Sequence, residues 1–118
     1  MQLQLKIMIC DAEGRFMGQG PYRLLLLTGK LGSLRRAAAE MGMSYSKAHA
    51  IIKRLENCLQ RQVVHTHAGG LSGGGAELTE FGNLLLDAYG KLEQRINAES
   101  AAAFTDFCAN LKNIPADG

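Results

Sequence analysis

A short segment, residues 44–54, concentrates side chains that can donate hydrogen bonds or carry positive charge. Its apolar residues recur with helical spacing, so we expect a helix with one buried face. That face consists of Ala48, Ile51, Ile52 and Leu55. The outer side chains near the start of such a helix can reach base edges in the major groove of DNA. These are Tyr45, Ser46, Lys47, His49 and Ala50. Packing over the preceding turn is the alternative role for Tyr45.

Four further basic residues are candidates for contacts with phosphate. Lys53 and Arg54 lie later in the same predicted helix, where they would fix the position of the protein without reading sequence. Arg35 and Arg36 precede that helix and are candidates for the flanking backbone. The N–H groups at a helix start also bind phosphate, which adds Ser44 to the candidate set. The alternative for Lys53 and Arg54 is a solvated surface.

Two helices joined by a tight turn are predicted over residues 33–59. Ser33 and Ser44 are good N-caps for the two helices, and Gly42 supplies the backbone freedom for the turn between them. The first helix has its own apolar stripe, formed by Leu34, Ala37, Ala38 and Met41. A helix, a tight turn and a basic helix are typical of a helix-turn-helix, which lays its second helix in the major groove.

A β-hairpin is predicted directly after the second helix. Residues 63–67 are rich in β-branched side chains, and residues 76–78 can form the partner strand, so the hairpin spans residues 63–78. Its glycine-rich tip can follow the DNA backbone closely, and the tip residues expected to contact DNA are Gly70, Gly73 and Gly74. Together with the two helices, this wing predicts a winged helix-turn-helix.

The flanking segments complete the predicted fold. Alternating residues from Leu3 to Ile9 and the turn after them suggest a short N-terminal hairpin, and Pro21 opens a helix that stops near Gly32. Thr79 caps a long helix over residues 79–112. We therefore expect a mainly α fold with small β elements, in one domain over residues 1–112, followed by a tail over 113–118.

Apolar residues recur along the C-terminal helix at roughly heptad spacing. They are Phe81, Leu85, Ala88, Leu92, Ile96, Ala103 and Phe107. One small domain cannot cover so long a seam, so the natural cover is the same helix of a second subunit. The sequence thus predicts a homodimer whose C-terminal helix is the dimerisation helix.

Composition and charge agree with a DNA-binding domain. The 118 residues suit one domain, 47% of them are apolar, and we find neither a secretory signal nor a membrane span, which predicts a cytoplasmic protein. The net charge is +2, but residues 30–67 carry +5 and residues 77–118 carry −4. The chain has an odd number of cysteines, and Cys10, Cys58 and Cys108 are far apart in the sequence. This predicts reduced, mostly buried thiols and not a disulfide framework.

Residues 32–39, 43–48, 55–56 and 69–79 together resemble the N-terminal DNA-binding domain of ModE-type molybdate-responsive regulators, which is similar to the winged helix of LysR-type regulators. The resemblance covers roughly residues 3–95. It implies a dimeric transcription factor whose paired recognition helices, here Ser44 to Arg54, read a near-palindromic operator.

The chain departs from that family at several places. Full-length regulators continue into a molybdate-binding domain where this chain ends, so we expect no molybdate site in it. Gln60 and Gln62 occupy positions that usually hold glycine and proline in the family, and Thr66 occupies a position that is often arginine. These differences bear on the phosphate affinity of the wing.

Three other functions compete with DNA-binding regulation. His65 and His67 could place two imidazoles on one face of a strand, as in a metal-responsive sensor. A nucleotide-binding loop is disfavoured because Gly75 is followed by Ala76 and Glu77 instead of Lys and Ser or Thr. A winged helix that dimerises or binds another protein without DNA stays open. No nucleophile–base pair indicates an enzyme, and no motif calls for a cofactor.

Overall fold

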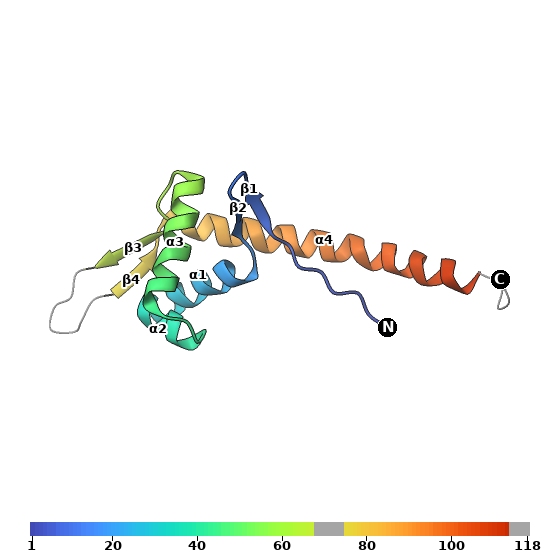
Figure 1. Cartoon of the computed structure of the whole chain (residues 1–118), viewed down its shortest axis with the longest axis horizontal. Helices are drawn as coiled ribbons and strands as arrows, with labels where there is room; N and C mark the ends of the chain where they lie inside the picture. Colours follow the sequence, from blue (N-terminus) through green and yellow to red (C-terminus); the bar gives the residue numbers. More distant parts are fainter. Residues whose placement is uncertain (68–74, 114–118) are drawn as a thin grey trace.

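The computed structural model describes residues 1–67 and 75–113. Over these residues the chain forms a winged helix-turn-helix with a long C-terminal helix (Figure 1). The helices are α1 (Gln19–Leu31), α2 (Leu34–Glu40), α3 (Tyr45–Leu59) and α4 (Glu80–Lys112). The strands form two antiparallel hairpins, β1 (Ile9–Asp11) with β2 (Gly14–Met17) and β3 (Val64–His67) with β4 (Gly75–Leu78). The predicted fold class is confirmed.

The predicted starts of α2, α3 and α4 are confirmed by side-chain caps. The hydroxyl oxygen of Ser33 accepts the Arg36 N–H and that of Ser44 accepts the Lys47 N–H, each at 3.1 Å. The Thr79 hydroxyl accepts the Gly82 N–H at 2.9 Å at the start of α4. Each cap satisfies a backbone donor that has no partner inside its helix. The starts of these three helices are therefore fixed by local chemistry that is visible in the sequence.

Glycine ends the first helix and makes the turn of the helix-turn-helix. Gly32, after α1, has φ 68°, and Gly42, between α2 and α3, has φ 69°. Residues with a Cβ rarely adopt this left-handed conformation, so glycine lets the chain reverse within a few residues. The tight turn predicted at Gly42 is confirmed.

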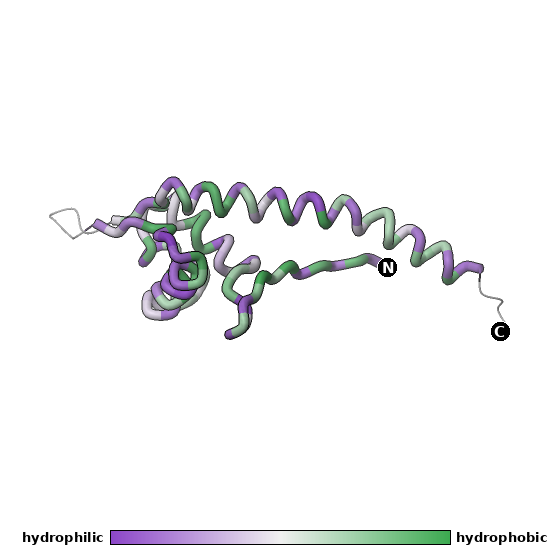
Figure 2. The backbone as a smooth tube through the Cα atoms, turned by 90° about the horizontal axis from the view of Figure 1, so that it is seen from above, coloured by the Kyte–Doolittle hydropathy of each residue, from purple (hydrophilic) through white to green (hydrophobic). Residues whose placement is uncertain are grey.

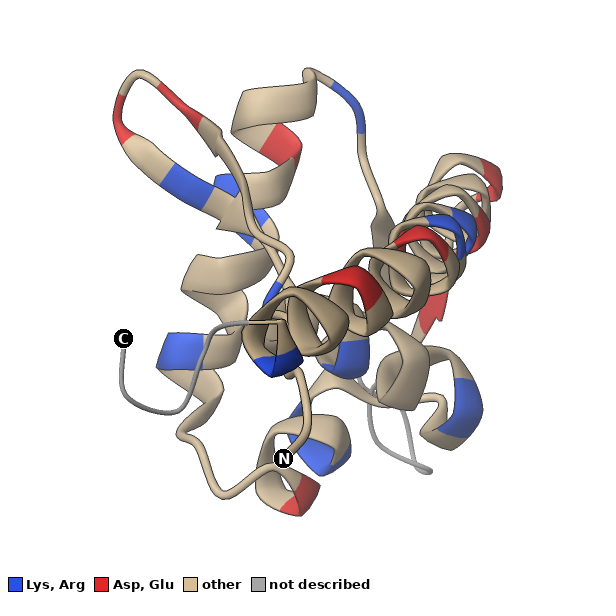
Figure 3. Ribbon diagram, turned by 90° about the vertical axis from the view of Figure 1, so that its right-hand side faces the viewer, with Lys and Arg blue, Asp and Glu red and all other residues tan. Residues whose placement is uncertain are grey.

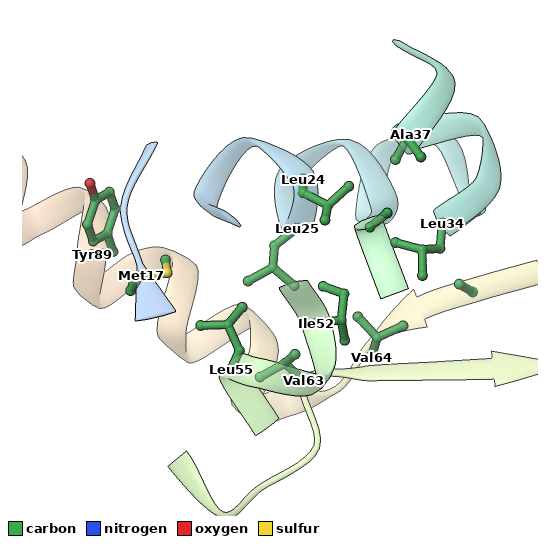
Figure 4. Close-up of a cluster of buried hydrophobic side chains, with 13 residues drawn as sticks. Met17, Leu24, Leu25, Leu34, Ala37, Ile52, Leu55, Val63, Val64 and Tyr89 are labelled. Atoms are coloured by element: carbon green, nitrogen blue, oxygen red, sulfur yellow. The ribbon is translucent and has the colours of Figure 1, made fainter. Parts of the chain in front are cut away.

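The hydrophobic core lies where α1, α2 and α3 meet the base of the wing. Figure 4 shows Leu25, Ile52, Leu55 and Val63 pointing toward one another from α1, α3 and the segment before β3. Ala37, Ala38 and Ala48 are also buried, and their small side chains let α2 and α3 approach closely. The N-terminal part of α4 joins this core through the buried Tyr89, whose hydroxyl donates to the Ile7 carbonyl at 2.8 Å.

The N-terminal hairpin is shorter than predicted. Residues 3–8 alternate like a strand, but only Ile9–Asp11 pair with β2, and the register shifts between Ile9 and Cys10. The preceding residues run as an extended segment that leaves the head of the molecule on the same side as α4 (Figures 1 and 2). The alternation predicted an extended backbone correctly but not its partner, because β2 is too short to pair with all of it.

Helix α4 continues well beyond the core. The molecule measures 73 Å along its longest axis and 27 Å across, and the C-terminal half of α4 forms the long projection (Figure 1). Hydrophobic and hydrophilic residues alternate along this helix (Figure 2). Leu92 is 37% exposed and Phe107 is 52% exposed, so part of the predicted apolar seam faces solvent in the single chain.

Two further expectations concern membranes and thiols. Within the described ranges, no helix has the length and apolar character needed to cross a bilayer. The three cysteines are free, as predicted, but their predicted burial is wrong. Cys10 is exposed, while Cys58 and Cys108 are half-buried. Cys10 lies in the middle of β1, a strand in which no residue is buried.

Candidate nucleic-acid interface

The N-terminal half of α3 presents its polar side chains to solvent. Ala48 is fully buried against the core, while Tyr45, Ser46, Lys47, His49 and Ala50 are all exposed. The burial pattern follows from the helical spacing of Ala48, Ile52 and Leu55, which turns the intervening residues outward. The structure thus brings together on one surface all five residues predicted to read base edges.

Tyr45 is held by neighbours on both sides. The Arg35 guanidinium, from α2, lies 4.4 Å from the centre of the Tyr45 ring, and the His49 ring centre lies 6.0 Å from it. A cation over an aromatic face is attracted by the ring's electron density. Tyr45 is 37% exposed. Its ring is therefore only partly covered by its neighbours, and part of it faces solvent. Sequence reasoning missed the Arg35 contact because the two residues belong to different helices.

A hollow of about 410 Å³ separates this stack from the base of the wing. Ser33, Arg35, Tyr45 and residues of β3 and β4 line it. The Ala76 N–H donates to the Gly32 carbonyl at 2.9 Å, which fixes the wing against the end of α1. The hollow is therefore bounded by a helix N-terminus and a basic side chain, both of which attract phosphate. Arg36, the other predicted phosphate contact in α2, is exposed.

The C-terminal half of α3 is engaged within the chain. Arg54, predicted to contact phosphate, instead binds the tip of the N-terminal hairpin. Its guanidinium donates to both Asp11 carboxylate oxygens, at 2.6 and 3.1 Å, to a Glu13 carboxylate oxygen at 3.4 Å and to the Gly14 carbonyl at 3.1 Å. Such a two-pronged contact with a carboxylate is the geometry that arginine favours. The structure therefore shows the Arg54 guanidinium engaged by carboxylates of its own chain.

Charge and hydrogen bonding shift the titration of this cluster. The Arg54 guanidinium holds the pKa of Asp11 well below its ordinary value, and Asp11 in turn raises the pKa of Arg54. The Cys58 thiol donates to the same carboxylate at 3.3 Å, and desolvation raises the pKa of Cys58 above its ordinary value. Cys58 is thereby kept as a protonated thiol, which is a poor nucleophile and a poor metal ligand.

Glu56, which pairs with Lys53, links α3 to the wing. The Lys53 ammonium lies 3.4 Å from a Glu56 carboxylate oxygen but is otherwise exposed, so it can still reach a phosphate. The other Glu56 oxygen accepts the N–H groups of Val63 and Val64, at 2.9 and 3.4 Å. Glu56 thus satisfies the backbone donors where the chain enters β3. This role of Glu56 was not predicted. The sequence did offer a signal for it, because Glu56 lies seven residues before the apolar pair Val63 and Val64.

The predicted wing is only partly described. Gly70, Gly73 and Gly74 lie outside the described residues. At the base of the wing, His65 pairs with Glu77 in the strand register, and the His67 imidazole lies 3.4 Å from a Glu77 carboxylate oxygen. In the parts of the chain that the structure covers, no group of three or more His, Cys, Asp or Glu residues could hold a metal ion. The geometry therefore gives no support to a metal site at His65 and His67.

Basic residues are distributed unevenly between the elements. Basic residues outnumber acidic ones in α2 and α3, whereas α4 carries five acidic and three basic residues (Figure 3). Five of the seven basic residues between positions 30 and 67 thus lie in the two helices that place the stack of Arg35, Tyr45 and His49. This combination of an exposed helix N-terminal half and surrounding positive charge fits a nucleic-acid backbone and groove.

Comparison with known proteins supports the same assignment. The family model of bacterial regulatory helix-turn-helix proteins of the lysR family matches residues 22–83. The molybdenum-pterin-binding protein MopB of Rhodobacter capsulatus is 35% identical over 92% of this chain and 39% of its own length. The molybdenum transport protein ModE of Azotobacter vinelandii is 37% identical over 60% of this chain and 26% of its own length.

A third relative carries a name that states DNA binding. The DNA-binding transcriptional dual regulator ModE of Escherichia coli is 35% identical over 53% of this chain and 24% of its own length. The chain thus spans between a quarter and two fifths of the length of these relatives. The similarity to ModE-type proteins predicted from residues 32–79 is confirmed.

Proposed function

Because the chain belongs to the lysR family of bacterial regulatory helix-turn-helix proteins, we propose that it binds double-stranded DNA as a homodimer and regulates transcription. One observation carries the proposal. The N-terminal half of α3 exposes Tyr45, Lys47 and His49 together, while its opposite face is buried in the core. A helix held in this way can enter a major groove without rearranging the domain.

The proposed contacts follow from where the side chains lie. Base edges are read by the first two turns of α3, that is by Tyr45, Ser46, Lys47, His49 and Ala50. The helix start at Ser44, together with Arg35, Arg36 and Lys53, contacts phosphate, and the wing tip at Gly70, Gly73 and Gly74 follows the DNA backbone. We assign Arg54 a different role from the one predicted. It orients α3 by binding Asp11.

The homodimer is proposed from the exposed seam of α4. Leu92 and Phe107, two residues of that seam, are exposed on a helix that projects from the head. Large apolar side chains along one helix are stabilised when a second helix covers them. Two copies joined through α4 would present two α3 helices to one duplex, which is why a near-palindromic operator is the expected target.

The alternative function is a winged helix that dimerises or binds another protein without binding DNA, and the same exposed seam of α4 favours it. The exposed residues of α4 support association with a protein whether or not α3 contacts DNA. The two functions differ in the use of α3, because only the DNA-binding function requires its outer face. Regulation by binding, without an enzymatic step, is common to both.

Selection of duplexes from a random pool, followed by a salt titration, tests the proposal. We expect enrichment of a near-palindromic sequence and an affinity that falls steeply with salt, since a protein that neutralises several phosphates releases as many counterions. Light scattering is expected to give a dimer. The Lys91→Ala/Arg95→Ala double variant, which removes two exposed charges from α4, is the control and should bind nearly as well as the parent. Absence of duplex binding even at low salt, with the dimer intact, would favour the protein-binding alternative.

A further inference from the structure

A cavity of about 540 Å³ lies between the N-terminal hairpin, the start of α1 and the outer side of α3. We propose that this cavity, here called the hairpin pocket, binds a small amphipathic organic anion, with an apolar body and a carboxylate or similar acidic group. Its volume falls within the range of pockets that hold small organic ligands. No part of the DNA-binding surface described above requires the cavity to be filled.

The floor of the hairpin pocket is apolar. Met17 is fully buried, and Ile7, Phe16, Met43 and Ile51 are partly buried around it. Three separate elements supply these side chains: the hairpin with its preceding segment, the turn before α3, and α3 itself. An aromatic or aliphatic body placed among them would remove apolar surface from water on both sides.

The rim of the hairpin pocket is positively charged. Lys6, Arg15, Lys47 and Arg54 line it, and no acidic residue does. Arg54 is already bound by Asp11 and Glu13, whose carboxylates lie outside the lining. Lys6, Arg15 and Lys47 form no ion pair with any residue in the described ranges. An anionic head group would therefore meet cations that the protein has not neutralised.

The position of the pocket gives its occupant a way to act on DNA binding. Lys47 and Ala50 line the pocket and also belong to the proposed base-reading set. A ligand that holds Lys47 would take from the duplex one of its contacts, so ligand and DNA would weaken each other's binding to the same extent. This coupling rests on the proposed function, whereas ligand binding does not.

Binding of 2-naphthoate, compared with its neutral analogue 2-naphthamide, tests the pocket without DNA. We expect the naphthoate to shift the amide resonances of Phe16, Gly18 and Ile51, and to bind about tenfold more tightly than the amide, as expected for the loss of one charged contact. Lys6→Gln/Arg15→Gln should lower the naphthoate affinity by about tenfold. Lys91→Gln/Arg95→Gln, which removes the same charge from remote exposed sites on α4, should leave it unchanged.

Three results would overturn the proposal. The first is equal affinity for the naphthoate and the amide. The second is an equal loss of naphthoate affinity in Lys6→Gln/Arg15→Gln and in Lys91→Gln/Arg95→Gln. The third is a set of resonance shifts confined to α4. If the protein binds duplex DNA but not naphthoate, the proposal of a ligand pocket is wrong and the proposed function is unaffected. If the protein binds naphthoate but no duplex DNA, the pocket is supported and the proposed DNA-binding function is wrong.

Discussion

The two halves of α3 both carry basic side chains but make different contacts. In the first half, the side chains of Tyr45, Lys47 and His49 point outward, and the Arg35 guanidinium from α2 lies against Tyr45. In the second half, Arg54 binds the hairpin tip and Glu56 binds the start of β3. A helix that must enter a groove needs one end free and the other fixed. The second half of α3 fixes the angle at which the first half leaves the domain.

The largest expected effect comes from breaking the link between α3 and β3. Glu56→Ala leaves the N–H groups of Val63 and Val64 without their acceptor at a place where both side chains are buried. We expect a loss of about 2–3 kcal/mol in the free energy of unfolding, measured by urea denaturation. Glu56→Gln keeps an acceptor oxygen and is the matched control. An equally large loss for Glu56→Gln would show that the charge, and not the acceptor, is what stabilises this junction.

Substituting one lysine in each half of α3, Lys47 or Lys53, tests whether the two halves contact DNA differently. Lys47→Ala should weaken binding to the selected duplex by about 1–2 kcal/mol and reduce the preference over other sequences, because Lys47 is placed to read bases. Lys53→Ala should weaken binding to all sequences about equally and lower the salt dependence, because it meets phosphate. Titration of a selected and a scrambled duplex measures both effects. Uniform losses for Lys47→Ala would remove it from the base-reading set.

Acid should loosen the fixed half of α3. The pKa of Asp11 in the folded protein lies well below its ordinary value near 4, so the Asp11–Arg54 contact stabilises the fold fully above that value and less as the pH falls below it. We expect the denaturation midpoint of the parent to drop between about pH 5 and pH 2, and Asp11→Asn to show a smaller drop.

The control for this acid effect is Asp106→Asn, which removes a carboxylate from the projecting part of α4. It should keep the parent's full drop in stability. The same drop in Asp11→Asn as in the parent would mean that other carboxylates dominate the acid response.

The smallest expected effect is at the end of the fixed half. Gln60 has φ 58°, the left-handed conformation that favours glycine, and its side chain donates to the Asn57 carbonyl at 2.6 Å. Gln60→Gly should raise the free energy of unfolding by about 0.5–1 kcal/mol, because it removes a strained backbone at the cost of one exposed hydrogen bond.

Gly42→Ala provides the opposite test. Gly42 also has a positive φ, and a Cβ there would meet no atom within 4 Å, so the substitution should cost about 1 kcal/mol through backbone conformation alone. A stability gain for Gly42→Ala, or a stability loss for Gln60→Gly, would show that these two turns are not limited by φ.

The sequence predicts the free half of α3 better than the fixed half. Ser44 as cap, and Ala48 with Ile52 as the buried stripe, depend on residues within a few positions of one another, so local spacing reveals them. The Arg54–Asp11 contact joins residues 43 positions apart, and nothing in the local pattern distinguishes an arginine bound within the chain from a solvated one. The same holds for the contact of Arg35 with Tyr45. The positive φ of Gln60 was not predicted, although glycine is usual at that position in the family that the chain resembles.

Cross-linking from the two halves of α3 tests the account most directly. Ala50 and Asn57 are both exposed and lie seven residues apart, so they occupy the same face of the helix in its two halves. With a photoreactive side chain at position 50, we predict cross-links to the selected duplex; with the same group at position 57, we predict few or none. Cross-links from position 57 alone, or from neither position in a complex that forms, would contradict the account.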